Sequence, residues 1–101
     1  MNIEEILQSK DLLLEDCVLV AKKPPFTWAS EARIVAVNDS YEIPDQVTQE
    51  GYQYVLECDE ILQLFAYLDT KKLSSRTRAE FVIHYAVYDC APEWITDIPN
   101  I

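Results

Sequence analysis

Glycine is nearly absent from this chain of 101 residues, in which Gly51 is the only one. A single glycine excludes the glycine-rich loops that bind phosphates, because those loops need several glycines where the backbone approaches the ligand. Histidine is equally scarce, since His84 stands alone. Every Ser-His-Asp or Cys-His set would have to use that one imidazole. We therefore expect a protein that is not an enzyme and needs no cofactor.

Basic residues are few as well: 8 Lys and Arg stand against 18 Asp and Glu, for a formal net charge of -10. Binding to nucleic acid through its phosphates needs clustered bases, so this balance argues against it. The same acidity argues against an anionic membrane surface, and no apolar run approaches the roughly 18 residues of a membrane span. The first residues also lack the regions of a secretory signal, which favours a cytoplasmic location without membrane contact.

Half of the residues are hydrophobic and 11% are aromatic, which is typical of a folded chain rather than of a disordered acidic tail. At this length we expect one globular domain over residues 1–101. Three widely separated cysteines, Cys17, Cys58 and Cys90, predict buried, reduced thiols in a monomer or weak dimer. Glu57 and Glu60 lack a companion histidine or a calcium-loop pattern, so we expect no metal site.

Local patterns predict the elements of the first half. Asn2 and Glu5 have the spacing of a capping box, which predicts a short helix from residue 3. The apolar, β-branched runs at 17–21 and 32–37 predict two buried strands. The loop between them holds two adjacent prolines, which cannot belong to a strand ladder. The two strands pair most simply as antiparallel neighbours across this loop.

The next segment predicts two helices and a stretch that fits both strand and helix. Pro44 is expected at the first position of a short helix, which Gly51 ends in a left-handed conformation. Residues 52–57 fit a third strand, with a helical extension as the open alternative. Asp59 is then expected to cap a longer helix. Its apolar face is formed by Ile61, Leu62, Leu64, Phe65 and Leu68.

The last element is expected to begin at Ser74 or Ser75. Its residues 81–88 also have high strand propensity, but the length and the serine cap favour a helix. Pro92 ends this element, and Trp94 is expected to pack on the core. Together the elements predict an α+β fold, in which a small antiparallel sheet packs against helices.

The charge distribution is the most informative feature of the sequence. Residues 34–70 hold eight acids and no Lys or Arg, whereas mixed signs on a folded surface reduce self-repulsion. This stretch is either a solvated face or a surface for a basic partner, with its tyrosines as anchors. In the second interpretation, the contact residues are Asp39, Tyr41, Glu42, Asp45, Glu50, Tyr52, Tyr54, Glu57 and Glu60.

Two other groups of side chains have competing interpretations. On a helix, Glu80 lies one turn before His84 and could orient its imidazole, although a structural histidine is the simpler interpretation. Arg76 and Arg78 fall in the first turn of the last helix, where the dipole disfavours cations. They either pair with nearby acids, Asp69 or Glu80, or form a small basic patch.

Four blocks follow one another along this acidic chain: Cys17-Val-Leu-Val-Ala, Ala32-Arg-Ile-Val-Ala-Val, Asp59-Glu-Ile-Leu-Gln-Leu-Phe and Phe81-Val-Ile-His-Tyr-Ala-Val-Tyr-Asp. In size, charge and order of elements, most of the chain resembles the small immunity proteins of bacterial contact-dependent inhibition and related polymorphic toxin systems. The resemblance implies that it binds and neutralises one toxin domain, often a basic nuclease, in the cytoplasm of the producing cell. The resemblance does not assign a function to any particular residue. The alternative is an acidic nucleic-acid mimic or an adaptor that binds another basic protein.

Overall fold

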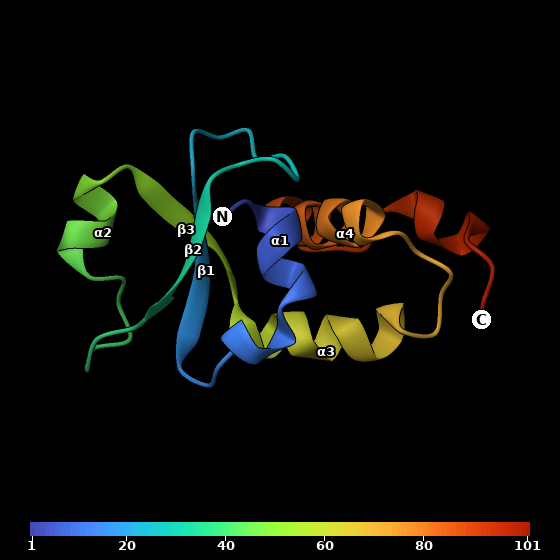
Figure 1. Cartoon of the computed structure of the whole chain (residues 1–101), viewed down its shortest axis with the longest axis horizontal. Helices are drawn as coiled ribbons and strands as arrows, with labels where there is room; N and C mark the ends of the chain where they lie inside the picture. Colours follow the sequence, from blue (N-terminus) through green and yellow to red (C-terminus); the bar gives the residue numbers. More distant parts are fainter.

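Three antiparallel strands form a sheet at the centre of the molecule, in the order β2-β1-β3. The computed structural model describes residues 1–101, and its strands are β1 (Cys17–Lys22), β2 (Ala32–Ala36) and β3 (Tyr52–Glu57). The helices are α1 (Ile3–Gln8), α2 (Asp45–Gln49), α3 (Cys58–Leu68) and α4 (Ser75–Tyr88), with short 3-10 helices at Lys10–Leu12 and Glu93–Asp97. Figure 1 shows α2 on one side of the sheet and α1, α3 and α4 on the other. The expected α+β fold is confirmed, with residues 52–57 as a strand and residues 81–88 as a helix.

The alternation of side chains along β1 gives the sheet two apolar faces of different size. Leu19 and Ala21 belong to the main core, on the face toward α1, α3 and α4. Val18 and Val20 belong to a smaller cluster on the opposite face, where Val47 of α2 packs. Because β1 is buried on both faces, its sequence is a continuous apolar run rather than an alternating one.

The pairing of β3 with β1 is interrupted at one residue. Leu19 pairs with Leu56 and Val20 pairs with Tyr54, so Val55 has no partner in β1. This extra residue is a β-bulge, which lets Val55 and Leu56 both enter the main core.

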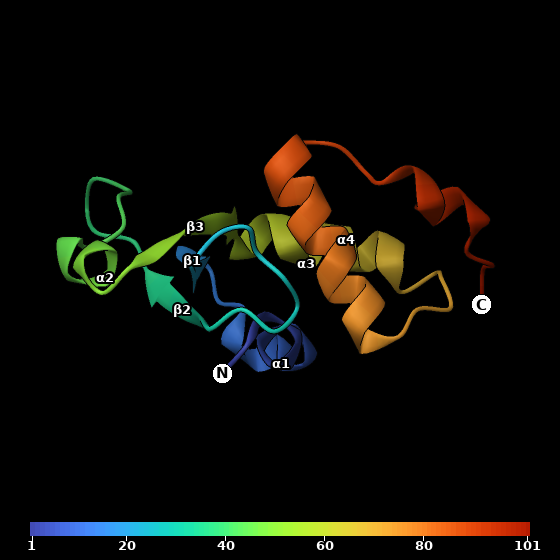
Figure 2. The ribbon, with the colours of Figure 1, turned by 90° about the horizontal axis from the view of Figure 1, so that it is seen from above.

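The main core lies between the sheet and the three helices on its larger face. Phe65 of α3 and Phe81 of α4 are among its largest fully buried side chains. The ring of Phe81 lies 6.3 Å from that of Tyr67 and 6.2 Å from that of Trp94, measured between centroids. Trp94 therefore packs on the core as expected. Figure 2 shows α4 crossing α3, with the C-terminal tail beyond them.

None of the helices has the length and apolar character that a membrane-spanning helix requires.

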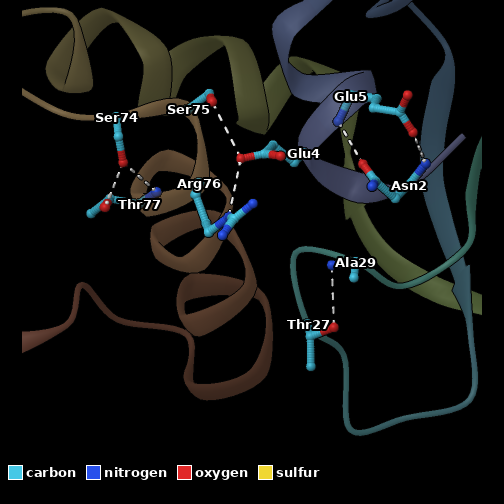
Figure 3. A network of polar contacts seen from close by, with 9 residues as sticks. All are labelled: Asn2, Glu4, Glu5, Thr27, Ala29, Ser74, Ser75, Arg76 and Thr77. Atoms are coloured by element: carbon cyan, nitrogen blue, oxygen red, sulfur yellow. Dashed lines mark hydrogen bonds and ion pairs between the residues drawn. The ribbon is translucent and has the colours of Figure 1, made fainter.

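The helix starts follow the capping signals at two of the expected places. The Asn2 side chain accepts a hydrogen bond from the Glu5 amide at 2.8 Å, and the Glu5 carboxylate accepts one from the Asn2 amide at 2.9 Å. At α4, the Ser74 hydroxyl accepts a hydrogen bond from the Thr77 amide at 3.1 Å. Both caps are visible in Figure 3.

We expect Asn2→Ala to lower the free energy of unfolding by about 1 kcal/mol, because the Glu5 amide, which has no backbone acceptor in the first turn, loses its side-chain acceptor. Urea unfolding of this variant measures the loss, and Gln8→Ala, at the exposed end of the same helix, is the control. Equal stability of Asn2→Ala and the unmodified chain would contradict the capping box.

Two helix starts differ from expectation. α3 begins at Cys58, with Glu57 at its N-cap position and no side-chain cap, so the prediction that Asp59 caps it is wrong. The reason is that β3 runs directly into α3, which places Asp59 inside the first turn. α2 begins at Asp45, with Pro44 at the N-cap position rather than at the first helical residue. Gly51 follows α2 with a φ of +94°, in the left-handed region as predicted.

Candidate functional site

A pocket of about 160 Å³ opens beside the end of the sheet at which β1 begins and β3 ends. Val18, Val37 and Ile43 are among the apolar side chains that line it. Its polar lining consists of five side chains that we call the acidic patch: Asp16, Tyr41, Tyr54, Glu57 and Asp59. They come from the turn before β1, the loop between β2 and α2, the end of β3 and the first turn of α3.

Antiparallel pairing brings these separate segments together. Val18 pairs with Glu57, so Asp16, just before β1, lies beside the residues that follow β3. The bulge at Val55 then places Tyr54 and Glu57 on the same face of the sheet, although three positions separate them along the strand.

Two carboxylates lie close enough to Tyr54 to act on its phenol. The Tyr54 side chain is 48% exposed. Partial burial raises the pKa of the phenol, and the carboxylates of Glu57 and Glu60 raise that pKa further. Glu60 is therefore close enough to act on Tyr54, although it does not line the pocket.

Tyr41 projects from a constrained loop. Its φ is +59°, a left-handed value that is uncommon for a bulky residue, and Asp16 has the same φ. The side chain of Asn38 fixes the loop by accepting hydrogen bonds from the amides of Ser40, at 2.9 Å, and Glu42, at 3.0 Å. The Tyr41 side chain is 80% exposed. The fold thus holds a large aromatic side chain in water beside the pocket, which suggests a contact made with a partner.

The carboxylates of the patch have no basic partner. Among the eight acids of residues 34–70, Glu50 pairs with Arg33 at 3.0 Å, and Asp69 pairs with both Lys10 and Arg78. The others have no Lys or Arg nitrogen within 4.0 Å: Asp39, Glu42, Asp45, Glu57, Asp59 and Glu60. Unpaired like charges on one surface repel, so cations from a partner would relieve the repulsion.

Two of the expected contact residues belong to another cluster, at the opposite end of the same sheet face. Tyr52 is buried, and its hydroxyl donates a hydrogen bond to Glu31 at 2.9 Å. Lys22 and Arg33 lie over its ring, at 4.7 and 5.4 Å from the centroid. Glu50 is paired with Arg33 in the same cluster. Because these groups already form hydrogen bonds and ion pairs with one another, Tyr52 and Glu50 do not belong to the acidic patch.

Of the remaining expected residues, Asp39 lies beside the patch, whereas Glu42 and Asp45 do not line it. Asp39 lines a neighbouring shallow pocket of about 210 Å³ together with Asp16 and Tyr41. Glu42 and Asp45 are exposed, but they line neither pocket. Sequence reasoning missed Asp16, which lies outside the acidic stretch, and Asp59, which it assigned to a helix cap. The signal that could have found Asp16 is its position just before a strand that pairs with residues 52–57.

The histidine and the two arginines have structural partners. His84 Nδ1 lies 3.0 Å from the backbone oxygen of Cys90, so one ring nitrogen is already engaged. Arg78 pairs with Asp69, as one interpretation predicted, and it is the main cause of the lowered pKa of Asp69. Arg76 pairs with Glu4 at 3.5 Å rather than with Glu80. The structure thus favours ion pairing over a free basic patch.

The cysteines differ in exposure, contrary to the expectation of three buried thiols. Cys58 is buried and Cys17 is half-buried, but Cys90 is exposed. The reason is that α4 ends at Tyr88 and its C-cap residue, Asp89, has a left-handed φ of +57°, so Cys90 lies beyond the helix that packs on the core.

We expect a thiol reagent at neutral pH to label Cys90 first and Cys58 last. Burial raises the pKa of the Cys58 thiol to about 12, which removes the reactive thiolate. Mass spectrometry of the time course measures the order, and Cys90→Ser should remove the fast phase. Added reductant should leave the melting temperature unchanged. Equal labelling rates at all three sites would contradict the packing of Cys58.

No group of three or more His, Cys, Asp or Glu side chains comes together in a way that could hold a metal ion. Comparison with known protein families, curated proteins and solved structures finds no match to this chain. Its function therefore has to be inferred from the chemistry of its surface.

Proposed function

We propose that the chain is an immunity protein, which uses the acidic patch to bind and neutralise a cognate bacterial toxin domain. One observation carries the proposal: carboxylates without basic partners surround two exposed tyrosines, Tyr41 and Tyr54, at a single pocket. Aromatic residues supply much of the binding energy in protein interfaces, and charges around them select the partner. The combination fits a basic protein surface better than it fits a solvated face.

A nuclease domain is the class of toxin that this surface fits best. A cleft that binds a polyanion presents Lys and Arg, and carboxylates can occupy it without being cleaved. Opposite charge also raises the association rate, by roughly ten- to thousand-fold at low salt. Tyr41 and Tyr54 then slow dissociation by burying their rings. The chain acts by occlusion in the cytoplasm of the producing cell, without turnover of its own.

Affinity purification from the native cell, followed by co-expression, tests this proposal. We expect one predominant basic partner that remains bound at high salt and stops bacterial growth when expressed alone. Co-expression of this chain should restore growth, whereas co-expression of the Tyr41→Ala, Tyr54→Ala double variant should not.

The alternative of a nucleic-acid mimic or adaptor predicts a different result. A mimic would bind many basic proteins, and salt would release most of them, because its affinity would come from net charge alone. If bacteria that express the partner grow equally well with and without the chain, and if salt releases a broad set of bound proteins, the immunity proposal is contradicted and the mimic is supported.

A further inference from the structure

A second surface lies between the loop that joins β1 to β2 and the C-terminal half of α4. A pocket of about 600 Å³ separates the two elements. The loop forms one wall and the helix forms the other, and the apolar lining includes Pro24, Pro25, Phe26, Trp28, Ile83 and Val87. This surface and the acidic patch lie beyond opposite ends of β1, whose six residues span about 20 Å.

An acidic pocket lies next to the apolar one. It has a volume of about 840 Å³ and adjoins the first pocket, since His84 and Tyr88 line both; we call the two pockets together the trough. Glu93 and Asp97 of the C-terminal tail line the acidic part, and Glu80 lines the apolar part. None of these three carboxylates forms an ion pair, and no Lys or Arg lines either pocket.

The loop wall is held in place before any partner binds. The Trp28 carbonyl accepts a hydrogen bond from the Glu4 amide at 3.1 Å, and the Arg76 guanidinium lies 3.6 Å from the Trp28 ring centroid. Arg76 is itself paired with Glu4, which also accepts a hydrogen bond from the Ser75 hydroxyl at 3.3 Å (Figure 3). A preformed wall lowers the entropy cost of binding.

The helix wall carries apolar groups that the core does not use. Val87 is 56% exposed and Tyr88 is 66% exposed, on adjacent positions of α4, whereas the buried residues of this helix end at Ile83. Exposed apolar side chains that gather at one groove indicate an interaction site more strongly than scattered ones do.

The charge at the trough selects the occupant. Residues 79–101 hold four acids and no Lys or Arg. A second copy of this chain would bring carboxylates against carboxylates, in a protein whose net charge is already -10. A partner segment with positive charge meets no such repulsion.

We propose that the trough binds a segment of a partner protein in which bulky apolar residues are followed by Lys or Arg. The apolar side chains fill the pocket between Phe26, Trp28 and Val87. The basic side chains reach Glu93 and Asp97. This proposal rests on the trough alone and is independent of the role of the acidic patch.

A fluorescein-labelled synthetic peptide with phenylalanines followed by lysines tests the proposal on the full chain. Titration is followed by fluorescence anisotropy and by NMR amide shifts. We expect saturable binding, with shift changes confined to residues 24–28, 83–88 and 93–97. A Val87→Ser, Tyr88→Ser double variant should bind about tenfold more weakly or worse, because two apolar contacts are lost. Tyr41→Ala, in the acidic patch, should bind as the unmodified chain does.

Two further peptides and one variant define the chemistry of the trough. Peptides with glutamates in place of the lysines, or serines in place of the phenylalanines, should each bind at least about tenfold more weakly. A Glu93→Gln, Asp97→Asn double variant should weaken binding of the lysine peptide and reduce its dependence on salt. All of these substitutions are at exposed positions, and melting curves check that the variants are folded.

Several results would overturn the proposal. These are no saturable binding, equal binding of the glutamate peptide, or shift changes centred on the acidic patch. Concentration-dependent shifts at the trough without peptide would assign it to contacts between copies of the chain instead.

Discussion

Charge reversal of Glu57 to lysine should weaken binding to the proposed partner by about 2–5 kcal/mol if the contact is buried in the complex. The reversal replaces an attraction with a repulsion in the middle of the acidic patch, next to Tyr54. Tyr54→Ala should cost about 2 kcal/mol or more, mainly through faster dissociation, because it removes a central aromatic contact. Surface plasmon resonance at low and high salt separates the two effects, since salt screens the charge and not the apolar contact.

A control of equal charge change decides whether position matters. Asp11 is an exposed acid outside both the patch and the trough and forms no ion pair, which makes Asp11→Lys suitable. Glu4 is unsuitable because it pairs with Arg76, and Asp97 is unsuitable because it lines the trough. We expect Asp11→Lys to change only the association rate, and only slightly. If it weakens binding as much as Glu57→Lys does, net charge alone drives the interaction and the patch is a solvated face.

Removal of the Phe81 ring should lower the free energy of unfolding by about 3–5 kcal/mol, in the range found for Phe→Ala in protein cores. Phe81 is 1% exposed and packs against Tyr67 and Trp94, so its loss leaves a cavity that α4 and the tail cannot easily fill. Small domains have total stabilities of roughly 5–15 kcal/mol, so Phe81→Ala should bring this one close to unfolding.

Urea unfolding of Phe81→Ala and Phe81→Leu measures this effect. The leucine variant keeps part of the buried volume and should lose clearly less stability than the alanine variant. A loss below about 1 kcal/mol for Phe81→Ala would contradict the described packing of α4 on the core, since surface substitutions cost that little.

Much of the fold follows from local sequence signals. The capping pair Asn2 and Glu5, the two apolar runs on either side of the prolines and the serine before α4 all predict elements that the structure confirms. These signals work because each depends on neighbours along the chain. The antiparallel pairing of β1 with β2 follows from the same locality, since only a loop separates them.

The parts that sequence did not predict depend on contacts between distant residues. The bulge at Val55 is set by packing on both faces of β3, so no local pattern marks it. Two ion pairs around Tyr52 join residues 22 with 31 and 33 with 50. These distant contacts bury Tyr52, although no apolar run surrounds it in the sequence. The predicted contact residues include Tyr41, Tyr54 and Glu57 of the patch, but tertiary structure adds Asp16 and Asp59 and places Tyr52 and Glu50 in another cluster.

Amide hydrogen exchange of the chain in complex with its proposed partner tests the central claim most directly. The account predicts protection on binding at residues 38–44 and 54–60 and around Asp16, with α1 and the β1–β2 loop unchanged. Protection confined to α1 or to the C-terminal tail, with the loop around Tyr41 exchanging as fast as in the free chain, would contradict it.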